Sequence, residues 1–222
     1  MKTKYYEMSF RYVFEKFLKN PEKYPQIVVF SDDNAVIVRD QFPKSIFHFL
    51  VLPRQFTFLR PQVAFQNSRF RKLMQKYVEK AKEILRNEFN QRYEFIDKND
   101  KLESHIKVCC HSLPSMKNLH IHVMTTDLYS DRMKNKKHYN SFTTQFAINW
   151  DEMPLDKEDP RFDDIEFCKQ LLKQDMIFEG QNYGGHFKQI KQAIEKRFND
   201  TIRLKNAHSS DSDQKVTFES KP

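Results

Sequence analysis

Two histidines separated by one residue are the first candidates for chemistry in this chain. A strand through the apolar run 119–123 places the side chains of His120 and His122 on one face, because side chains alternate along a strand. A neutral imidazole is a nucleophile near pH 7, and its protonated form can donate a proton to a leaving oxygen. The pattern therefore predicts a histidine site suited to phosphoryl or nucleotidyl transfer.

Two further histidines fall in neighbouring apolar segments. His111 lies near the end of the run 105–113, and His48 interrupts the run 45–52, so four of the eight histidines are expected to converge at one end of a sheet. Two other interpretations stay open at this point. A strand histidine is most often simply packed or exposed to solvent, and paired histidines also bind metals. A third metal ligand is missing nearby, because Asp127 lies beyond the strand.

The elements that must position these residues indicate an α+β fold with a mainly antiparallel sheet and flanking helices. Alternation and turn residues predict strands at 27–30, 35–38, 45–52, 105–113, 119–125 and 142–149, the first two joined as a hairpin. Helical spacing predicts helices at 8–19, which Pro21 ends, at 67–90 and around 187–198. A lysine-rich connection at 133–142 is expected to lead into the last strand.

Composition narrows the classes of protein to be considered. The 222 residues, 39% of them hydrophobic, suffice for one main domain. All three glycines stand at 180 or later, which argues against a phosphate-binding glycine loop earlier in the chain. No apolar run could span a membrane, and three cysteines predict no disulfide framework. The net charge of +8 predicts affinity for a polyanion such as nucleic acid.

Three segments together carry a family resemblance. DQFPKSIFHFLVLPR at 40–54, HSLPSMKNLHIHVMTTD at 111–127 and RMKNKKHYNSF at 132–142 resemble the histidine-triad (HIT) domain of the aprataxin family, and fungal aprataxin-like proteins in particular. The resemblance covers about residues 8–150. Many histidine-triad proteins carry H-x-H-x-H, whereas here Asn118 takes the first position. The resemblance implies a HIT-like catalytic domain over 1–150 with an N-terminal helix.

The implied activity is removal of AMP from abortively ligated, 5′-adenylated DNA in DNA repair, without a required cofactor. The resemblance makes His120 the nucleophile that forms a covalent AMP-histidine intermediate, which water then hydrolyses. His122 would stabilise charge on the phosphate and His48 would assist the leaving group. The resemblance also implies two sets of binding residues. Nucleotide and phosphate contacts fall on His111, Ser112, Ser115, Lys44 and Met116, and DNA contacts fall on Phe10, Lys134, Lys136, Lys137 and His138. In the family the N-terminal helix presents an aromatic wedge to the terminal base pair, and Phe10 takes that position here. Phe14 or Tyr12 are alternative wedges, and packing in the core is the alternative role for all three rings.

The C-terminal part departs from the family pattern. Aprataxins end in a small zinc finger, but the four ligand positions here hold Ile165, Cys168, Ala193 and Arg197, so Cys168 is the only surviving ligand. A different alignment gap would restore His186 as a ligand. A tetrahedral structural site needs four donors, and Cys168 with His186 makes at most two, so we expect no structural zinc. We expect a degenerate zinc-finger-like, DNA-contacting unit with its linker at 151–206, docked on the main domain, and a disordered tail at 207–222.

The expected partners are nicked or broken DNA bearing a 5′-adenylate, and AMP as product. The protein is expected to be a monomer that does not bind membranes. Its expected location is the nucleus, with the cytoplasm as a further location. Two alternative functions remain. The chain could be a histidine-triad hydrolase of small-molecule adenylates, or a non-catalytic basic DNA-binding module in which the histidines are structural.

Overall fold

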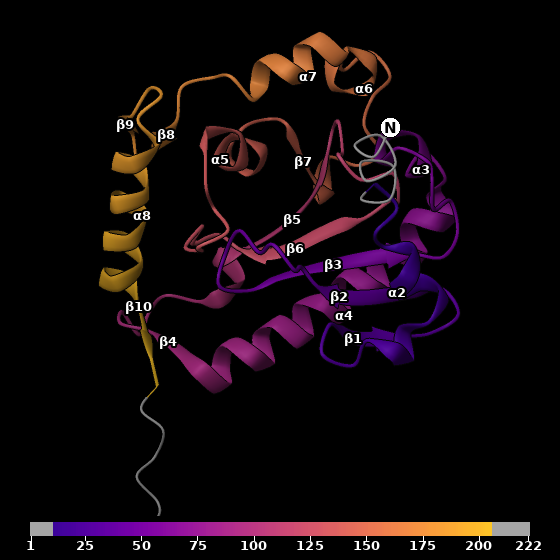
Figure 1. Cartoon of the computed structure of the whole chain (residues 1–222), viewed down its shortest axis with the longest axis horizontal. Coiled ribbons are helices and arrows are strands. Elements are labelled where there is room, and N and C mark those ends of the chain that lie inside the picture. Colours follow the sequence, from indigo (N-terminus) through magenta and orange to yellow (C-terminus); the bar gives the residue numbers. More distant parts are fainter. Residues whose placement is uncertain (1–10, 206–222) are drawn as a thin grey trace, which may run out of the picture.

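Six strands of the chain pair into one sheet in which all neighbouring strands are antiparallel. The computed structural model describes residues 11–205, and the strand order is β1-β2-β3-β6-β5-β7 (Figure 1). This agrees with the predicted α+β class. The strands are β1 (Val28–Ser31), β2 (Ala35–Arg39), β3 (His48–Pro53), β5 (Ile106–His111), β6 (Ile121–Thr125) and β7 (Ala147–Asn149).

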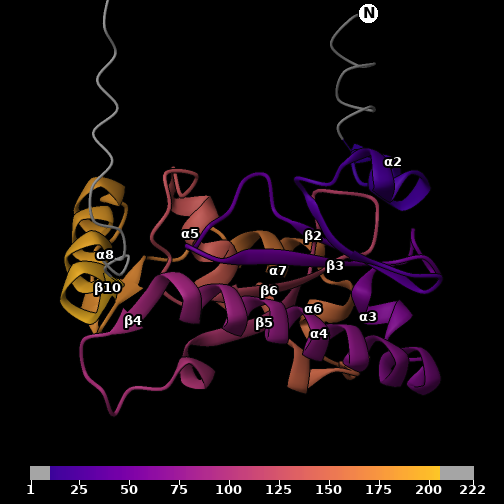
Figure 2. The ribbon, with the colours of Figure 1, turned by 90° about the horizontal axis from the view of Figure 1, so that it is seen from below.

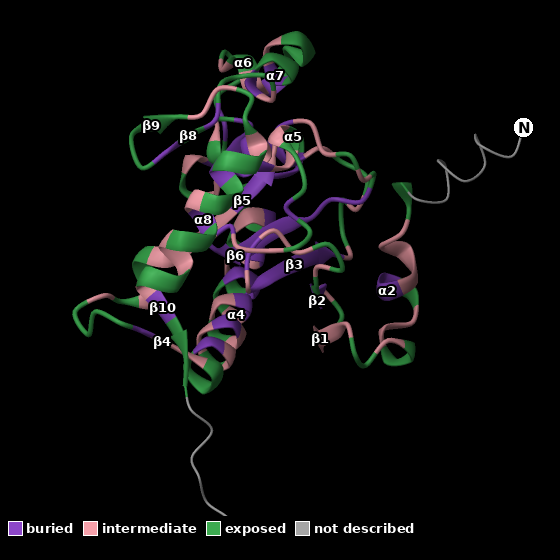
Figure 3. Cartoon of the chain, turned by 60° about the vertical axis from the view of Figure 1, so that its left-hand side comes forward, coloured by how far each residue is buried: buried purple, intermediate pink, exposed green. Residues whose placement is uncertain are grey.

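The two faces of the sheet have different environments because side chains alternate along each strand. Ile37 of β2, Val51 of β3 and Val123 of β6 point into the largest hydrophobic core. The residues next to them in sequence point to the opposite face, which carries His48 and His122. The interior strands β3 and β6 are buried along their length (Figure 3), as expected for a run that is apolar on both sides.

Helix α4 (Ser68–Arg92) covers the apolar face of the sheet (Figure 2). It begins where the side chain of Asn67 accepts a hydrogen bond from the backbone N–H of Phe70, which satisfies one of the unpaired donors of the first turn. Its buried residues recur at helical spacing, including Met74, Val78 and Leu85. The sequence prediction for this helix is therefore confirmed to within two residues at either end.

The N-terminal helix is shorter than expected within the described residues. Helix α2 (Glu15–Lys19) follows a turn at Tyr12–Phe14 and stops at Asn20, before the 3₁₀-helix η1 (Pro21–Lys23). Its Phe17 and Leu18 pack on the face of the sheet opposite α4, against alternate residues of β2 and β3. Residues 8–10 of the predicted helix lie outside the described residues.

The expected strand at 142–149 is wrong over most of its length. Residues 136–143 form helix α5 (Lys136–Thr143), and only Ala147–Asn149 pair as β7. Asn135 caps the helix by accepting a hydrogen bond from the backbone N–H of His138 at 2.9 Å. Tyr139 and Phe142, one turn apart, are both buried on its inner side. Burial of these two rings favours helix as far as Thr143, and residues 144–146 turn into β7, so the strand begins five residues later than predicted.

The C-terminal part packs on the main sheet through helices and two short strand pairs. Helix α8 (Phe187–Thr201) leads into β10, which pairs with β4 so that Ile202 lies opposite Phe95 (Figure 1). Ile190 and Ile194 of α8 join a second hydrophobic core with Tyr139 and Phe142 of α5. The remaining elements of this part are α6 (Pro160–Asp163), α7 (Ile165–Leu171), β8 (Ile177–Phe178), β9 (Gln181–Asn182) and β10 (Ile202–Leu204), with β4 (Tyr93–Phe95) as the partner of β10.

Three short helices complete the described chain. The predicted boundary after residue 150, between the catalytic domain and the C-terminal unit, stays a prediction. No helix within residues 11–205 combines the length and the apolar character needed to cross a membrane. The short helices are α3 (Pro61–Ala64), η2 (Leu102–His105) and η3 (Trp150–Glu152).

Candidate active site

Four histidines meet on the sheet face opposite α4, as the strand pattern predicts. His122 of β6 lies at the centre: the centroid of its ring is 4.5 Å from that of His111, 4.9 Å from that of His120 and 5.1 Å from that of His48. The strand order explains this, because β6 lies between β3, which begins with His48, and β5, which ends with His111. Residues more than sixty positions apart thus form one cluster.

The backbone fixes the tautomer of His120. Its Nδ1 lies 2.8 Å from the carbonyl oxygen of Asn118, two residues earlier. A carbonyl oxygen can only accept, so Nδ1 carries the proton and Nε2 keeps its lone pair. Of the two ring nitrogens, Nε2 is therefore the one available to attack an electrophile.

A chain of hydrogen bonds fixes the protons on His48 and His122. The backbone N–H of Lys44 donates to Nδ1 of His48 at 3.1 Å, so the neutral His48 ring carries its proton on Nε2. The Nε2–H of His48 donates to Nδ1 of His122, which lies 2.8 Å away. Because Nδ1 of His122 accepts this hydrogen bond, the proton of the neutral His122 ring is on its Nε2. The Nε2 atom of His122 is buried and has no partner among the described residues. It is a donor ready for a phosphate oxygen.

Burial keeps the four rings uncharged near neutral pH. Desolvation lowers the pKa of His48 to about 4, and a carboxylate oxygen of Asp40, 3.6 Å from its Nδ1, offsets this only in part. Desolvation likewise lowers the pKa of His120. Desolvation, together with the neighbouring rings, holds the pKa values of His111 and His122 well below the usual value. A neutral His120 is the form that can act as a nucleophile.

The same cluster offers a potential metal site, which its hydrogen bonds disfavour. One ligand atom each from Asp40, His48 and His122 lie within 4.8 Å of one another. A neutral imidazole has a single lone pair, however, and those of His48 and His122 are both occupied by hydrogen bonds. The donor set therefore fits a proton-sharing histidine pair better than a metal centre. That the site needs no metal stays a prediction.

Two aromatic residues that the sequence analysis did not assign to the site hold the histidines in place. The ring of Phe142 in α5 contacts those of His48, His111 and His122, with centroids 4.7 to 5.5 Å apart. Phe14 stands edge-on to His120 at 5.3 Å. No sequence signal marks Phe142, because its predicted strand is in fact a helix; Phe14 follows only from the aromatic character of the N-terminal segment.

A buried carboxylate that lies beyond β6 joins the two strands that carry His48 and His122. Asp127 accepts hydrogen bonds from the backbone N–H of Ile46 at 3.1 Å and of Tyr129 at 2.8 Å, and from the hydroxyl of Thr125. Ile46 lies two residues before His48, so Asp127 fixes the approach to β3. The sequence analysis weighed this residue only as a metal ligand.

The predicted phosphate-binding residues fall into two groups. Ser112 is buried and its hydroxyl has no hydrogen-bond partner among the described residues, as is also true of Nε2 of His111. Ser115 is exposed and Met116 half-buried, on the loop between β5 and β6. Lys44 is half-buried with its pKa lowered by desolvation, and its charge contributes to the low pKa of the three clustered rings His48, His111 and His122.

The predicted DNA-binding residues lie on and before α5, with one exception. Lys134 and Lys137 are exposed, whereas Lys136 lies 3.7 Å from a carboxylate oxygen of Asp175. Desolvation and the nearby charge of Lys44 lower the pKa of His138. The same helix reaches the histidine cluster through Phe142. Phe10 lies outside the described residues.

The C-terminal cysteine and histidine considered as zinc ligands do not belong to any cluster of metal-ligating side chains among residues 11–205. Cys168 is buried, and its Sγ lies 3.9 Å from the carbonyl oxygen of Arg161; His186 is exposed at the start of α8. Among residues 11–205, the one group of three or more metal-ligating side chains is the set at His48. The absence of structural zinc remains a prediction.

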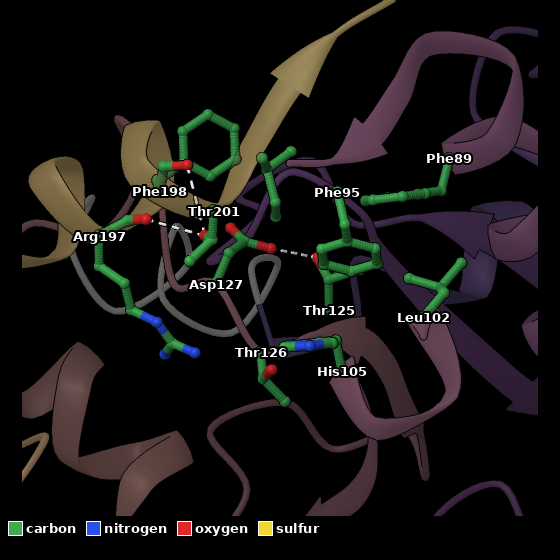
Figure 4. Close-up of a pocket in the computed structure, with 11 residues that line it drawn as sticks. Phe89, Phe95, Leu102, His105, Thr125, Thr126, Asp127, Arg197, Phe198 and Thr201 are labelled. Carbon is green, nitrogen blue, oxygen red and sulfur yellow. Dashed lines mark hydrogen bonds between the residues drawn. The ribbon is translucent and has the colours of Figure 1, made fainter. Parts of the chain in front are cut away.

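A small cavity lies at the end of β6, and none of the four clustered histidines lines it. Phe95, His105 and Phe198 line it together with Asp127 (Figure 4). Its volume of about 10 Å³ has room for about one water molecule. This cavity is therefore too small for a nucleotide, and the reactive groups of the molecule lie in the histidine cluster.

An antiparallel sheet with neutral histidines clustered around an H-x-H strand defines a protein of the histidine-triad class. The family described as "Scavenger mRNA decapping enzyme C-term binding" matches residues 11–138. The aprataxin-like protein of Saccharomyces cerevisiae is 33% identical over 89% of this chain and all of its own length. The aprataxin-like protein of Schizosaccharomyces pombe is 32% identical over 90% of this chain and 86% of its own.

Solved structures agree with these relatives. The crystal structure of the aprataxin ortholog Hnt3 in complex with DNA has a TM-score of 0.72 at 29% identity and covers 86% of this chain and 96% of that one. Hnt3 in complex with DNA and guanosine has a TM-score of 0.71 at 30% identity, with the same coverage. This chain belongs to the aprataxin family of the histidine-triad superfamily, which confirms the resemblance seen in the sequence.

Proposed function

We propose that this chain is a DNA 5′-adenylate hydrolase that acts through a covalent AMP-histidine intermediate on His120. The observation that carries the proposal is the free lone pair on Nε2 of His120, which its hydrogen bond to the Asn118 carbonyl secures. The Hnt3 complexes with DNA, and with DNA and guanosine, support a DNA substrate and a site for a purine nucleoside.

The chemistry follows from the placement of the protons. Nε2 of His120 attacks the phosphorus of the adenylate and forms a P–N bond, while the P–O bond to the 5′-phosphate of the DNA breaks. The 5′-phosphate leaves with the bonding electron pair. Water then attacks the same phosphorus, breaks the P–N bond and releases AMP. No further co-reactant is needed.

The other histidines stabilise charge on the way. The unpaired Nε2–H of His122 donates to a phosphate oxygen, where negative charge grows in the transition state. His48 holds His122 in this tautomer through its own Nε2–H. Because both of its ring nitrogens are occupied, His48, the leaving-group residue of the family, assists departure of the 5′-phosphate through His122. Ser112 and His111 have unpaired polar atoms for the remaining phosphate oxygens.

The decisive experiment is to trap the intermediate. The protein is mixed with DNA whose 5′-adenylate carries a labelled phosphate, denatured under alkaline conditions that preserve a P–N bond, and digested to locate the label. We expect the label on His120 and none in His120→Ala. His186→Ala, which removes an exposed histidine, is the control and should label normally. Label on another residue, or full AMP release by His120→Ala, contradicts the proposal.

A second measurement separates DNA from small adenylates as the substrate. The exposed Lys134 and Lys137 beside the site favour a polyanion. We therefore expect AMP release from a nicked adenylated duplex to exceed release from a small-molecule adenylate in kcat/KM, with the difference falling as salt rises. Equal efficiency on both would favour the small-adenylate hydrolase.

A further inference from the structure

Three cations on the outer side of α4 have no part in the fold or in the proposed chemistry. Arg69, Lys72 and Lys76 are exposed, and none of them forms an ion pair or a side-chain hydrogen bond within residues 11–205. Their spacing of three and four residues places them along one side of the helix, over about 10 Å. The buried Met74 and Val78 lie on the opposite side. We call Arg69, Lys72 and Lys76 the basic stripe.

The cations in the second half of the same helix are all paired with carboxylates. The pairs are Lys80 with Glu83, Lys82 with Glu79, Arg86 with Glu103 and Arg92 with Glu88. In the first half, the guanidinium of Arg71 donates to the carbonyl oxygen of Met153. Among residues 11–205, the unpaired positive charge of α4 is therefore concentrated in the basic stripe.

The basic stripe lies where positive charge destabilises a helix. The first turn of α4 contains no acidic residue and carries Arg69, although the partial positive charge at the N-terminus of a helix favours carboxylates there. Lys72 follows Arg69 by three residues and precedes Lys76 by four, and like charges at these spacings repel each other. A bound anion removes both unfavourable effects. Positions that break local rules without a gain in the fold are expected at functional sites.

The composition of this side of α4 favours a phosphate backbone over a protein surface as the partner. The large hydrophobic side chains that are exposed among residues 11–205 all lie outside α4. Protein–protein interfaces are rich in aromatic side chains and poor in lysine, whereas lysine and arginine are typical contacts to DNA phosphates. A row of three free cations without an apolar neighbour therefore fits a nucleic-acid backbone.

The basic stripe points away from the histidine cluster. Helix α4 covers one face of the sheet and the clustered histidines lie on the other, so the helix and the sheet separate the stripe from His120 (Figure 2). Duplex DNA is stiff over about 150 base pairs. A duplex that presents its 5′ end at His120 therefore cannot bend round the molecule to reach the stripe, and the ligand of the stripe is a second stretch of duplex.

We propose that the basic stripe is a second binding site for duplex DNA, which contacts the phosphate backbone without reading its sequence. The inference rests on the proposed function in taking DNA as the polyanion, and it adds a bridging activity. One molecule holds a damaged end at the histidines and an intact duplex at α4. Arg69, Lys72 and Lys76 each contact a phosphate, so binding at the stripe weakens steeply as salt rises.

The first test uses a duplex closed by a hairpin loop at each end, which offers phosphates without a nick or a 5′ end. Its affinity for the full chain is measured at several salt concentrations. We expect the double variant Lys72→Gln, Lys76→Gln to bind it about tenfold or more weakly, and the slope of log affinity against log salt to fall by about two. Glutamine and lysine have similar helix propensities, so the melting temperature should not fall.

The second test measures bridging. Beads that carry a nicked duplex with a 5′-phosphate are loaded with protein, and retention of the labelled closed duplex is recorded. The unmodified protein should retain the closed duplex, whereas Lys72→Gln, Lys76→Gln should stay on the beads without retaining it. Unmodified protein that stays on the beads and retains no closed duplex contradicts the inference.

The matched control is the double variant Lys101→Gln, Lys157→Gln, which removes the same charge at two exposed lysines outside α4. It should bind the closed duplex within about twofold of the unmodified protein. Equal losses in the two double variants, or displacement of the closed duplex by poly-glutamate at equal charge, would each overturn the inference, the latter in favour of an acidic protein partner.

AMP release from a short nicked, adenylated duplex separates this inference from the proposed function. It should proceed at the same rate in the unmodified protein and in both double variants. A slower rate in Lys72→Gln, Lys76→Gln alone would place the basic stripe on the substrate DNA and contradict a second site. Absence of AMP release in the unmodified protein contradicts the proposed function alone, because the closed duplex carries no adenylate.

Discussion

The different roles of the histidines follow from the hydrogen-bond partner of each ring. His120 immediately precedes β6 and His122 lies within it. His120 donates through Nδ1 to the Asn118 carbonyl, whereas His122 accepts through Nδ1 from His48. One ring therefore has a free lone pair and the other a free proton on Nε2. The sequence shows the shared face but cannot show these partners, since they depend on the turn before β6 and on a strand from another part of the chain.

A pH dependence of stability follows from the low pKa of the buried histidines. For a histidine whose folded pKa is lowered, the unfolded chain binds the proton more tightly, so stability is lost as pH falls through the range between the two values. For His48 that range runs from about 6.5 down to about 4. We expect the free energy of unfolding to be insensitive to this residue above pH 7 and to fall by up to about 1.4 kcal/mol per pH unit below 6.5.

The variant His48→Gln isolates this contribution. The glutamine amide can still accept from the Lys44 N–H and donate to His122, but it does not titrate. Urea unfolding at several pH values should show a shallower loss of stability below pH 6.5 in His48→Gln than in the unmodified chain. His186→Gln, at an exposed position, should follow the unmodified chain. Parallel curves for His48→Gln and the unmodified chain would contradict a buried neutral His48.

At the scale of elements, local pattern predicts the strands from β1 to β5 across the sheet and fails at the edge formed by β7. The apolar run 35–38, the alternation in 119–125 and the helical spacing in 67–90 give the hairpin, the H-x-H strand and α4 to within a few residues. Helix α5 is missed because its lysine-rich sequence indicates a connection rather than a helix, and because its stability depends on packing against distant residues such as Ile190 of α8. Convergence of the four histidines is predictable, whereas the contact of Phe142 with three of them is not.

Phe142 gives α5 a role in the site that can be tested. Its buried ring packs against His48, His111 and His122, so Phe142→Ala removes their common support. We expect a loss of about 3–5 kcal/mol in the free energy of unfolding. We also expect AMP release under saturating substrate to slow by about tenfold or more, because small displacements of reacting groups are costly. Urea titration and single-turnover kinetics measure the two effects.

A buried phenylalanine on the opposite face of the sheet provides the comparison for Phe142. Phe89 of α4 is equally buried but packs against Phe47 and Phe95 rather than the histidines. Phe89→Ala should lower stability by a similar amount and leave the rate of AMP release by the folded protein within about twofold. If both variants slow the reaction equally, Phe142 acts through general stability and does not position the site.

At the scale of the whole molecule, the C-terminal part depends on the main sheet for its hydrophobic contacts. Ile190 and Ile194 of α8 share a core with Met124 of β6 and Tyr139 of α5. Cys168 and Leu171 of α7 pack against Phe146, which precedes β7. The pairing of β10 with β4 adds backbone hydrogen bonds between the two parts. A small unit that buries its apolar side chains in this way has a source of stability other than a metal.

The expected absence of structural zinc can be tested on the intact protein. Elemental analysis of the purified chain should find far less than one zinc per molecule, and a strong chelator should leave the melting temperature unchanged, because the folding of α7 and α8 rests on their packing against the sheet. Cys168→Ala should lower the free energy of unfolding by about 1 kcal/mol through lost packing alone, and by the same amount with and without chelator. His186→Ala should change neither quantity, since its exposed ring would matter only as a ligand. One tightly bound zinc per chain, together with a chelator-induced fall in melting temperature that Cys168→Ala abolishes, would show that the unit is held by metal after all.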